Sequence, residues 1–196
     1  MSADVELKSF SVGSMDNNVY ILIDPTTRAS VLFDAPTNAA RILGELEGTS
    51  CKYILMTHAD RDHIEALEEV KAATGAAVGA HPDAAGHLPI AADFTLHDGQ
   101  VISFGQQQLR VLYTPGHAPG HMSFVIGNMV FDGDTLFPGG PGNTERPDGD
   151  FGTIIESIRS KLFTLPDETT VYPGHGKSTT IGAERPHLQE WIDRGS

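Results

Sequence analysis

Short apolar runs separated by glycine, proline or aspartate divide most of the chain into strand-sized segments. Runs of about four to eight apolar residues between turn residues are typical of β-strands. Gly127-Asn128, between two such runs, is a two-residue hairpin signal. On this pattern we predict strands at residues 5–12, 19–23, 30–33, 52–56, 76–80, 101–104, 108–113, 122–126, 129–131 and 170–172.

Helical spacing of apolar residues occurs between these runs. Ile64, Leu67 and Val70, for example, share one face of a single helix expected at residues 62–73. We also predict a helix capped by Thr37 or Asn38 that ends near residue 47, a helical turn opened by Pro82, helices at residues 153–163 and 184–192, and a long loop at residues 137–150. Strands and helices interleaved in two halves indicate an α/β fold with two face-to-face sheets and helices outside.

Length and charge narrow the class of protein. A chain of 196 residues with 39% hydrophobic and 20% charged residues suits one domain, spanning residues 1–196. A net charge of −13 repels phosphate backbones and anionic lipid, so we expect neither a nucleic-acid nor a membrane partner. The first six residues lack the pattern of a secretory signal, which makes a cytoplasmic protein the default expectation. Cys51, the single cysteine, excludes an internal disulfide and a thiolate-rich metal cage.

The densest chemical signal is the segment Thr57-His58-Ala59-Asp60-Arg61-Asp62-His63, between a predicted strand and a predicted helix. Loops at strand ends present side chains from a rigid sheet, which is why ligands bind there. His58 and Asp60 are two residues apart in an extended stretch and project to the same side. Four potential metal ligands within six residues indicate a metal site.

Three further segments resemble the first, because each places a histidine or an aspartate just past a strand. The residues concerned are His117 in TPGHAPGH, Asp134 in FDGDTLF and His175 in VYPGHG. Neighbouring glycines let the backbone approach closely at each position. In this order, the four motifs resemble those of the metallo-β-lactamase superfamily, and within it the glyoxalase II-like (hydroxyacylglutathione hydrolase-like) branch. The resemblance covers nearly the whole chain.

The resemblance implies a four-layer αβ/βα sandwich with a binuclear metal site at the edge where the two sheets meet. Position by position, it implies a first metal held by His58, residue 60 and His117, and a second held by Asp62, His63 and His175. Asp134 would bridge the two ions together with a water or hydroxide, which Asp62 would orient as a catalytic residue. Two such ions, about 3.5–4 Å apart, polarise a substrate carbonyl and make the bridging water more acidic.

Asp60 departs from the family pattern, which usually has histidine at this position. With Asp62 and Asp134 it brings the carboxylates of the site to three. Oxygen ligands shift metal preference towards harder ions. We therefore expect two divalent ions, zinc first, with iron or manganese as alternatives because of Asp60. The persulfide dioxygenases, a related branch, imply a different reading: one iron held at the positions of His58, His117 and Asp134.

A small molecule is the expected partner, and a thioester or related activated ester the expected substrate of a metallo-hydrolase. Only residues 176–196 follow His175, whereas full-length glyoxalase II enzymes carry a C-terminal helical domain that recognises glutathione, so glutathione itself is not predicted. Lactones fit the same chemistry, and a degenerate metal-binding protein without activity is a further alternative. The sequence does not predict an oligomeric state.

Other polar residues near the motifs receive simpler interpretations. We expect His121 to support a ligand by hydrogen bonding rather than to bind metal. Asp132 fits either a supporting role or the cap of a turn, and Asp34 is interpreted as a residue that fixes the turn after its strand. The remaining histidines are expected to be ordinary surface or loop residues: His81, His87, His97 and His187.

Overall fold

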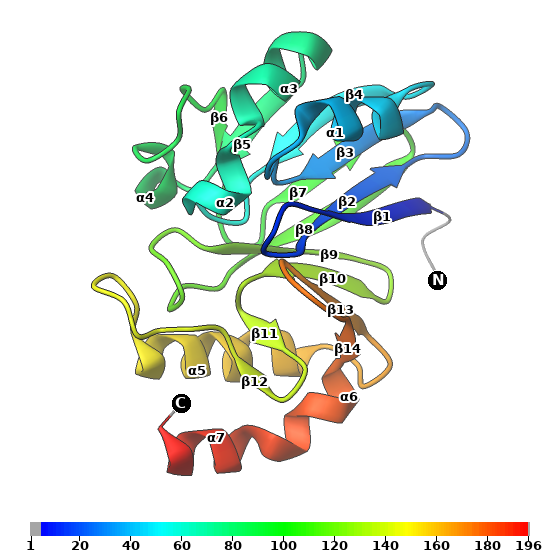
Figure 1. Cartoon of the computed structure of the whole chain (residues 1–196). Helices are drawn as coiled ribbons and strands as arrows, with labels where there is room; N and C mark the ends of the chain where they lie inside the picture. The colour runs from blue at the N-terminus through cyan, green and yellow to red at the C-terminus, as the bar shows by residue number, and fades with distance from the viewer. Residues whose placement is uncertain (1–4, 196) are drawn as a thin grey trace.

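The computed structural model describes residues 5–195 and contains two six-stranded sheets packed face to face, with helices on both outer sides (Figure 1). The prediction that no secretory signal is present concerns residues 1–6, of which residues 1–4 lie outside the described residues. No helix in the described part of the chain is both long and apolar enough to span a membrane.

The first sheet has the strand order β1-β2-β3-β4-β5-β6. Its first three strands pair antiparallel, and the strands from β3 to β6 pair in parallel. Parallel pairing puts the carboxyl ends of β3, β4 and β5 at one edge. The strands are β1 Glu6–Val12, β2 Asn17–Ile23, β3 Ala29–Phe33, β4 Ser50–Leu55, β5 Ala77–Ala80 and β6 Phe94–Thr95.

The second sheet has the order β14-β13-β10-β9-β8-β7. It is antiparallel except for β10 and β13, which run parallel and so end side by side. The strands are β7 Val101–Phe104, β8 Gln107–Tyr113, β9 Met122–Ile126, β10 Met129–Gly133, β13 Thr170–Pro173 and β14 Thr179–Thr180. A two-stranded sheet of β11 Leu136–Phe137 and β12 Gly140–Pro141 lies in the loop after β10.

Three apolar clusters separate four layers, which confirms the αβ/βα sandwich. One lies between the first sheet and its helices, one between the sheets, and one between the second sheet and its helices. The helices are α1 Ala39–Leu46, α2 Arg61–Ile64, α3 Leu67–Thr74 and α4 Pro82–Ala85 on the first side, and α5 Phe151–Ser160, α6 Ile181–Glu184 and α7 Leu188–Arg194 on the second.

Strand β2 shows how the sequence produces these layers. Successive side chains of a strand point to opposite faces of the sheet. Val19 and Ile21 enter the cluster beneath α1 and α3, while Tyr20 and Leu22 enter the cluster between the sheets. All four side chains are buried, so this strand is apolar on both faces and reads as a continuous apolar run.

The single helix predicted at residues 62–73 is wrong in one respect, because the structure divides it into α2 and α3. Ala66 leaves the helical path, and its N–H donates to the carbonyl of Ala35 at 3.0 Å. The carbonyl of His63 accepts in turn from the N–H of Ala35 at 2.9 Å. The segment is therefore tied to the end of β3, and this interruption sets the position of His63.

Other boundaries also differ from the prediction. The terminal helix expected at residues 184–192 is three short pieces, α6, a 3₁₀ turn at Arg185–His187 and α7. Pro186 accounts for the break, because it lacks the N–H that a continuous helix needs. The short strands β6 and β14 were not predicted, since two residues carry no periodicity. Asn38 rather than Thr37 caps α1, accepting from the N–H of Arg41 at 3.2 Å.

Candidate metal centre

The seven predicted ligands come together at the edge where the two sheets meet. His58 follows β4, Asp134 follows β10 and His175 follows β13, so three strand ends supply one ligand each. His117 lies on the loop between β8 and β9. The remaining ligands, Asp60, Asp62 and His63, come from the turn between β4 and α2 and from α2 itself.

A first group of potential ligands consists of His58, Asp60 and His117, whose ligand atoms all lie within 4.8 Å of one another. Asp60 Oδ2 is 3.3 Å from His117 Nε2 and 3.6 Å from His58 Nε2. Because His58 and His117 are buried and Asp60 is partly exposed, the group faces solvent through Asp60. We call this group the first subsite.

A second group consists of Asp62, His63 and His175, within the same limit. His175 Nε2 is 3.2 Å from Asp62 Oδ2 and 3.2 Å from His63 Nε2. The two imidazole nitrogens face each other beside the Asp62 and Asp134 carboxylates, an arrangement that favours positive charge from protons or from a metal ion. We call this group the second subsite.

Asp134 lies between the two subsites. Its Oδ2 is 3.6 Å from His117 Nε2 in the first subsite and 3.5 Å from His175 Nε2 in the second. Its Oδ1 is 3.6 Å from His63 Nε2. A carboxylate with one oxygen near a histidine of each group and the other oxygen near His63 can bridge two cations.

Hydrogen bonds orient the four imidazoles of the centre. In each ring Nδ1 meets an acceptor, so the proton is assigned to Nδ1 and the lone pair of Nε2 points into the centre. For His58, His63, His117 and His175 the acceptors are, in that order, Thr57 Oγ1 at 2.9 Å, Asp34 Oδ2 at 2.8 Å, the Asn143 carbonyl at 2.7 Å and the Met15 carbonyl at 2.8 Å.

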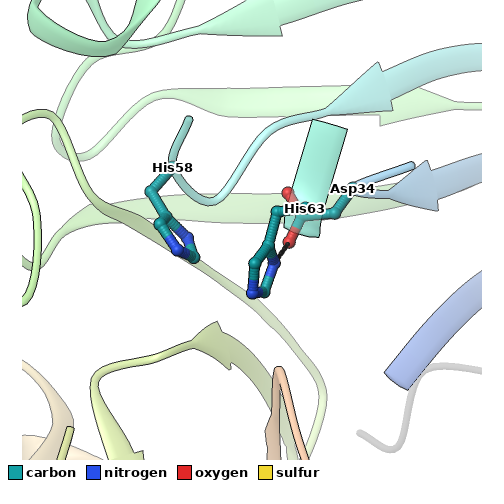
Figure 2. Close-up of side chains that lie close together, drawn as sticks. All are labelled: Asp34, His58 and His63. Carbon is teal, nitrogen blue, oxygen red and sulfur yellow. Dashed lines mark hydrogen bonds and ion pairs between the residues drawn. The ribbon is translucent and has the colours of Figure 1, made fainter. Parts of the chain in front are cut away.

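Asp34 does more than fix a turn, which corrects the interpretation from sequence. It does adopt a positive φ of 56° after β3, as a turn residue would. Its buried carboxylate also accepts from the N–H and the hydroxyl of Thr57, both at 2.7 Å, and from His63 Nδ1. Figure 2 shows Asp34 reaching His63 beside His58. The residue therefore orients one ligand directly and a second through Thr57.

Two buried polar atoms in the centre have no hydrogen-bond partner, and they fit a metal. They are His58 Nε2 and Asp134 Oδ1. An unpartnered buried nitrogen or carboxylate oxygen costs free energy unless a cation or a proton satisfies it. Imidazole and carboxylate are ligands that zinc, iron and manganese accept. The residues present therefore suit a divalent metal ion in this position.

Mutual attraction perturbs the pKa values of the second subsite. Hydrogen bonds to Asp134 and Asp62 raise the pKa of His175 to about 10. Burial is the largest single influence and opposes the protonated form of His63, but the hydrogen bond and charge of Asp34, together with the charges of Asp134 and Asp62, raise the pKa of His63 to about 9. The hydrogen bond from His175 holds the pKa of Asp62 below its usual range. Protons and carboxylates thus stabilise each other here, and a metal ion would replace the protons.

Arg146, from the loop at residues 137–150, is a site residue that sequence analysis missed. Its Nη2 donates to Asp60 Oδ1 at 2.8 Å and its Nη1 makes a second, short contact to Asp60 Oδ2. Nη1 also lies 3.3 Å from His117 Nε2. Arg146 is the sole basic residue of that loop, but nothing in the sequence pairs it with Asp60, which lies 86 positions away.

His121 and Asp132 act behind the ligands. The N–H of Asp134 donates to His121 Nε2 at 3.1 Å, so His121 supports Asp134 by a hydrogen bond to its backbone, as expected. Asp132 accepts from the N–H of Leu136 at 2.9 Å and thereby caps the turn that follows β10. Burial raises the pKa of this carboxyl well above its usual value. The other histidines, His81, His87, His97 and His187, belong to neither subsite.

A cleft of about 450 Å³ opens beside the centre. It is lined by His117, Asp134 and His175, by the loop from Phe137 to Asn143, and by Arg194 of α7. A molecule in this cleft would therefore touch one histidine of each subsite and Asp134.

Sequence comparisons find a matching family and similar relatives. The family model of the metallo-beta-lactamase superfamily matches residues 13–175. The hydroxyacylglutathione hydrolase GloC of Haemophilus influenzae is 30% identical, over 92% of this chain and 95% of its own. A hydroxyacylglutathione hydrolase of a Methylobacterium species is 38% identical over 87% of this chain, and the match spans 66% of that relative.

Three solved structures share the fold of this chain. The B3 metallo-beta-lactamase BLEG-1 superposes with a TM-score of 0.87 at 29% identity, over 93% of this chain and 98% of that one. ETHE1 from Myxococcus xanthus superposes with a TM-score of 0.86 at 30% identity, over 93% and 83%. TTHA1623, solved in a di-iron-bound form, gives a TM-score of 0.80 at 31% identity, over 91% and 96%.

Proposed function

Because the chain belongs to the metallo-beta-lactamase superfamily, we propose that it is a metal-dependent hydrolase of a thioester or a related activated ester. One observation carries the proposal: Asp134 lies between two groups of histidines and aspartates whose lone pairs converge. A cation-binding centre whose residues line a cleft suits the hydrolysis of a carbonyl compound. The relatives named hydroxyacylglutathione hydrolase support the thioester class.

Two divalent ions fit the donor set. His58, His117 and Asp60 would hold one ion, Asp62, His63 and His175 the other, and Asp134 would contact both. The di-iron-bound form of TTHA1623 supports two ions, and the three carboxylates admit iron or manganese beside zinc. When bound, the ions would supply Lewis acidity to the substrate carbonyl and to the attacking water.

Asp62 is the proposed proton acceptor in the reaction. Asn17 Nδ2 donates to Asp62 Oδ2 at 2.8 Å, and His175 approaches the same oxygen, so the carboxylate is held ionised at the centre. An ionised carboxylate beside the water site can orient the water and take its proton as the carbonyl is attacked. The leaving thiolate would depart through the cleft that Phe137 and Arg194 line.

Thiol release from metal-defined protein tests this function. Full-length chain stripped of metal and reloaded with zinc, iron or manganese would be offered S-acyl thiols, with liberated thiol followed by a chromogenic disulfide. We expect turnover that disappears in Asp134→Asn, while Asp150→Asn, a matched change at the N-cap of α5, keeps it. Turnover of lactones alone would change the substrate class, and absence of bound metal under every loading condition would refute the proposal.

A persulfide dioxygenase is a second candidate, favoured by the contact between Arg146 and Asp60. With both oxygens of Asp60 engaged, His58, His117 and Asp134 remain as two histidines and one carboxylate, a set that suits a single iron. Oxygen uptake and sulfite release from glutathione persulfide by the iron-loaded protein would select this candidate over the hydrolase. The hydrolase is preferred because the second subsite is also complete.

A further inference from the structure

The first subsite contains a cation of the protein's own. The Arg146 guanidinium contacts both oxygens of Asp60, and its Nη1 lies 3.3 Å from His117 Nε2. His117 Nδ1 already meets the Asn143 carbonyl, so Nε2 carries the lone pair that a metal would need. Arg146 therefore engages two of the three ligand side chains of this subsite through the same atoms that would bind an ion.

The second subsite differs in this respect. Its carboxylate, Asp62, accepts from the neutral amide of Asn17 at 2.8 Å, and Asp62 Oδ2 lies 3.2 Å from His175 Nε2. A neutral donor competes weakly with a dication, whereas a guanidinium brings both a positive charge and a bidentate geometry that matches carboxylate. Asp60 therefore has a partner that carries a permanent charge and cannot bind metal, whereas the partners of Asp62 are a neutral amide and an imidazole that can itself become a ligand.

Arg146 also has a second carboxylate partner, Asp148. Its Nε donates to Asp148 Oδ1 at 2.7 Å and its Nη2 lies 3.2 Å from Asp148 Oδ2. Asp148 is exposed, and the loop that carries both residues lies at the protein surface. A guanidinium that leaves Asp60 would keep this partner, so its departure does not require an unpaired charge.

We propose that Arg146 competes with a metal ion for the first subsite, so that the first subsite binds metal more weakly than the second. This inference rests on the proposed metal centre. The second subsite fills first, with Asp134, and the first fills only when the guanidinium leaves Asp60 and keeps its contacts with Asp148. Asp60 and Arg146 together set how much metal is needed to load both positions.

A zinc titration of the metal-stripped full-length chain, read by calorimetry against a chelator of known affinity, tests the proposal. In the wild type we expect two steps, with the second ion bound at least tenfold more weakly than the first. Arg146→Met keeps the apolar stem without the charge and should tighten the second step at least tenfold. Arg159→Met, the same change at an exposed pair with Glu156 on α5, should leave both steps unchanged.

Opposite outcomes separate the two roles that Arg146 could have. If Arg146 positions Asp60 as a ligand, Arg146→Met will weaken the second step, and that result would overturn the proposal. An unchanged second step would overturn it as well. Wild-type protein that binds no ion refutes the metal centre itself, whereas two equal steps that Arg146→Met does not alter refute this inference alone.

Asp60→His gives an independent test, because it removes the carboxylate that holds the guanidinium. We expect Asp60→His to tighten the second step, and Arg146→Met added to it to change affinity less than threefold. A thermal unfolding curve confirms that each variant is folded. If Arg146→Met does not fold, a second step in Asp60→His as weak as in the wild type still counts against competition.

Discussion

Asp34→Asn is the substitution that best separates metal binding from folding in this protein. The change keeps the size of a buried side chain that accepts from the N–H and hydroxyl of Thr57 and from Nδ1 of His63. The new amide must point its NH₂ group at one of these donors. If it faces His63, the proton of that imidazole must move to Nε2, the nitrogen that points into the metal centre.

The expected size of the effect follows from the hydrogen bond that is lost. A hydrogen bond to a charged group contributes about 1.5–3 kcal/mol. Since 1.4 kcal/mol corresponds to a factor of ten, zinc affinity should fall about tenfold to a hundredfold. Loss of a partner behind a metal-binding histidine has effects of about the same range. The loss should concern the second subsite, because His63 belongs to it.

Asp24→Asn is the matched control. Asp24 is also buried and accepts from the N–H of Thr26 at 3.1 Å, from Thr27 Oγ1 at 2.6 Å and from the N–H of Gln106 at 2.8 Å, but it lies beyond the far end of β2. Both variants should unfold at lower urea concentration than the wild type. Only Asp34→Asn should lose zinc affinity in a chelator-competition titration; equal affinities in the two variants would refute the role assigned to Asp34.

Three further predictions concern the same centre. A Cβ at Gly174 would lie 2.7 Å from His63 Cε1 and would also clash with Asp134 Oδ1. Gly174→Ala should therefore lower zinc affinity at least tenfold. Gly44→Ala, whose Cβ would meet no atom within 4 Å, should leave zinc affinity unchanged. The pKa of His63 is raised to about 9 and that of His175 to about 10, so their protonation stabilises the metal-free protein fully below about pH 6.5. This contribution disappears as the pH rises through 9 and 10, and the urea midpoint of unfolding should fall over that range. The midpoint should fall less steeply with pH in His175→Gln, and an equally steep fall would contradict the prediction. Asp60→His should raise zinc content relative to iron and manganese in protein purified from metal-supplemented cultures, which elemental analysis would detect.

The fold was predictable because its signals are local. Strand β2 was predictable from its unbroken apolar run at residues 19–23, and α1 was predictable from the cap residue Asn38. The division between α2 and α3 was not predictable, because it depends on hydrogen bonds to Ala35, which is distant in sequence. Apolar periodicity continues through the interruption, so the pattern alone predicts one helix.

The candidate ligands were predictable for a different reason, since each one lies in a recognisable motif that follows a strand. The residues behind them were not. Asp34 looks like any aspartate after a strand, and only the structure shows its contact with His63. Arg146 lies 86 positions from Asp60, in a loop without periodicity, and pairs of that kind leave no pattern in a single sequence. That the seven residues bind metal stays a prediction, which the titrations above examine.

The origin of the ligands in both sheets has a consequence for how the protein persists in a cell. His58 and His63 come from the first sheet and its helix, whereas Asp134 and His175 end strands of the second. An ion bound here would clamp the two halves of the sandwich, so its binding free energy would add to the free energy of unfolding. Scarcity of metal should then shorten the lifetime of the polypeptide against proteases, and a chelator should act on it as a mild denaturant.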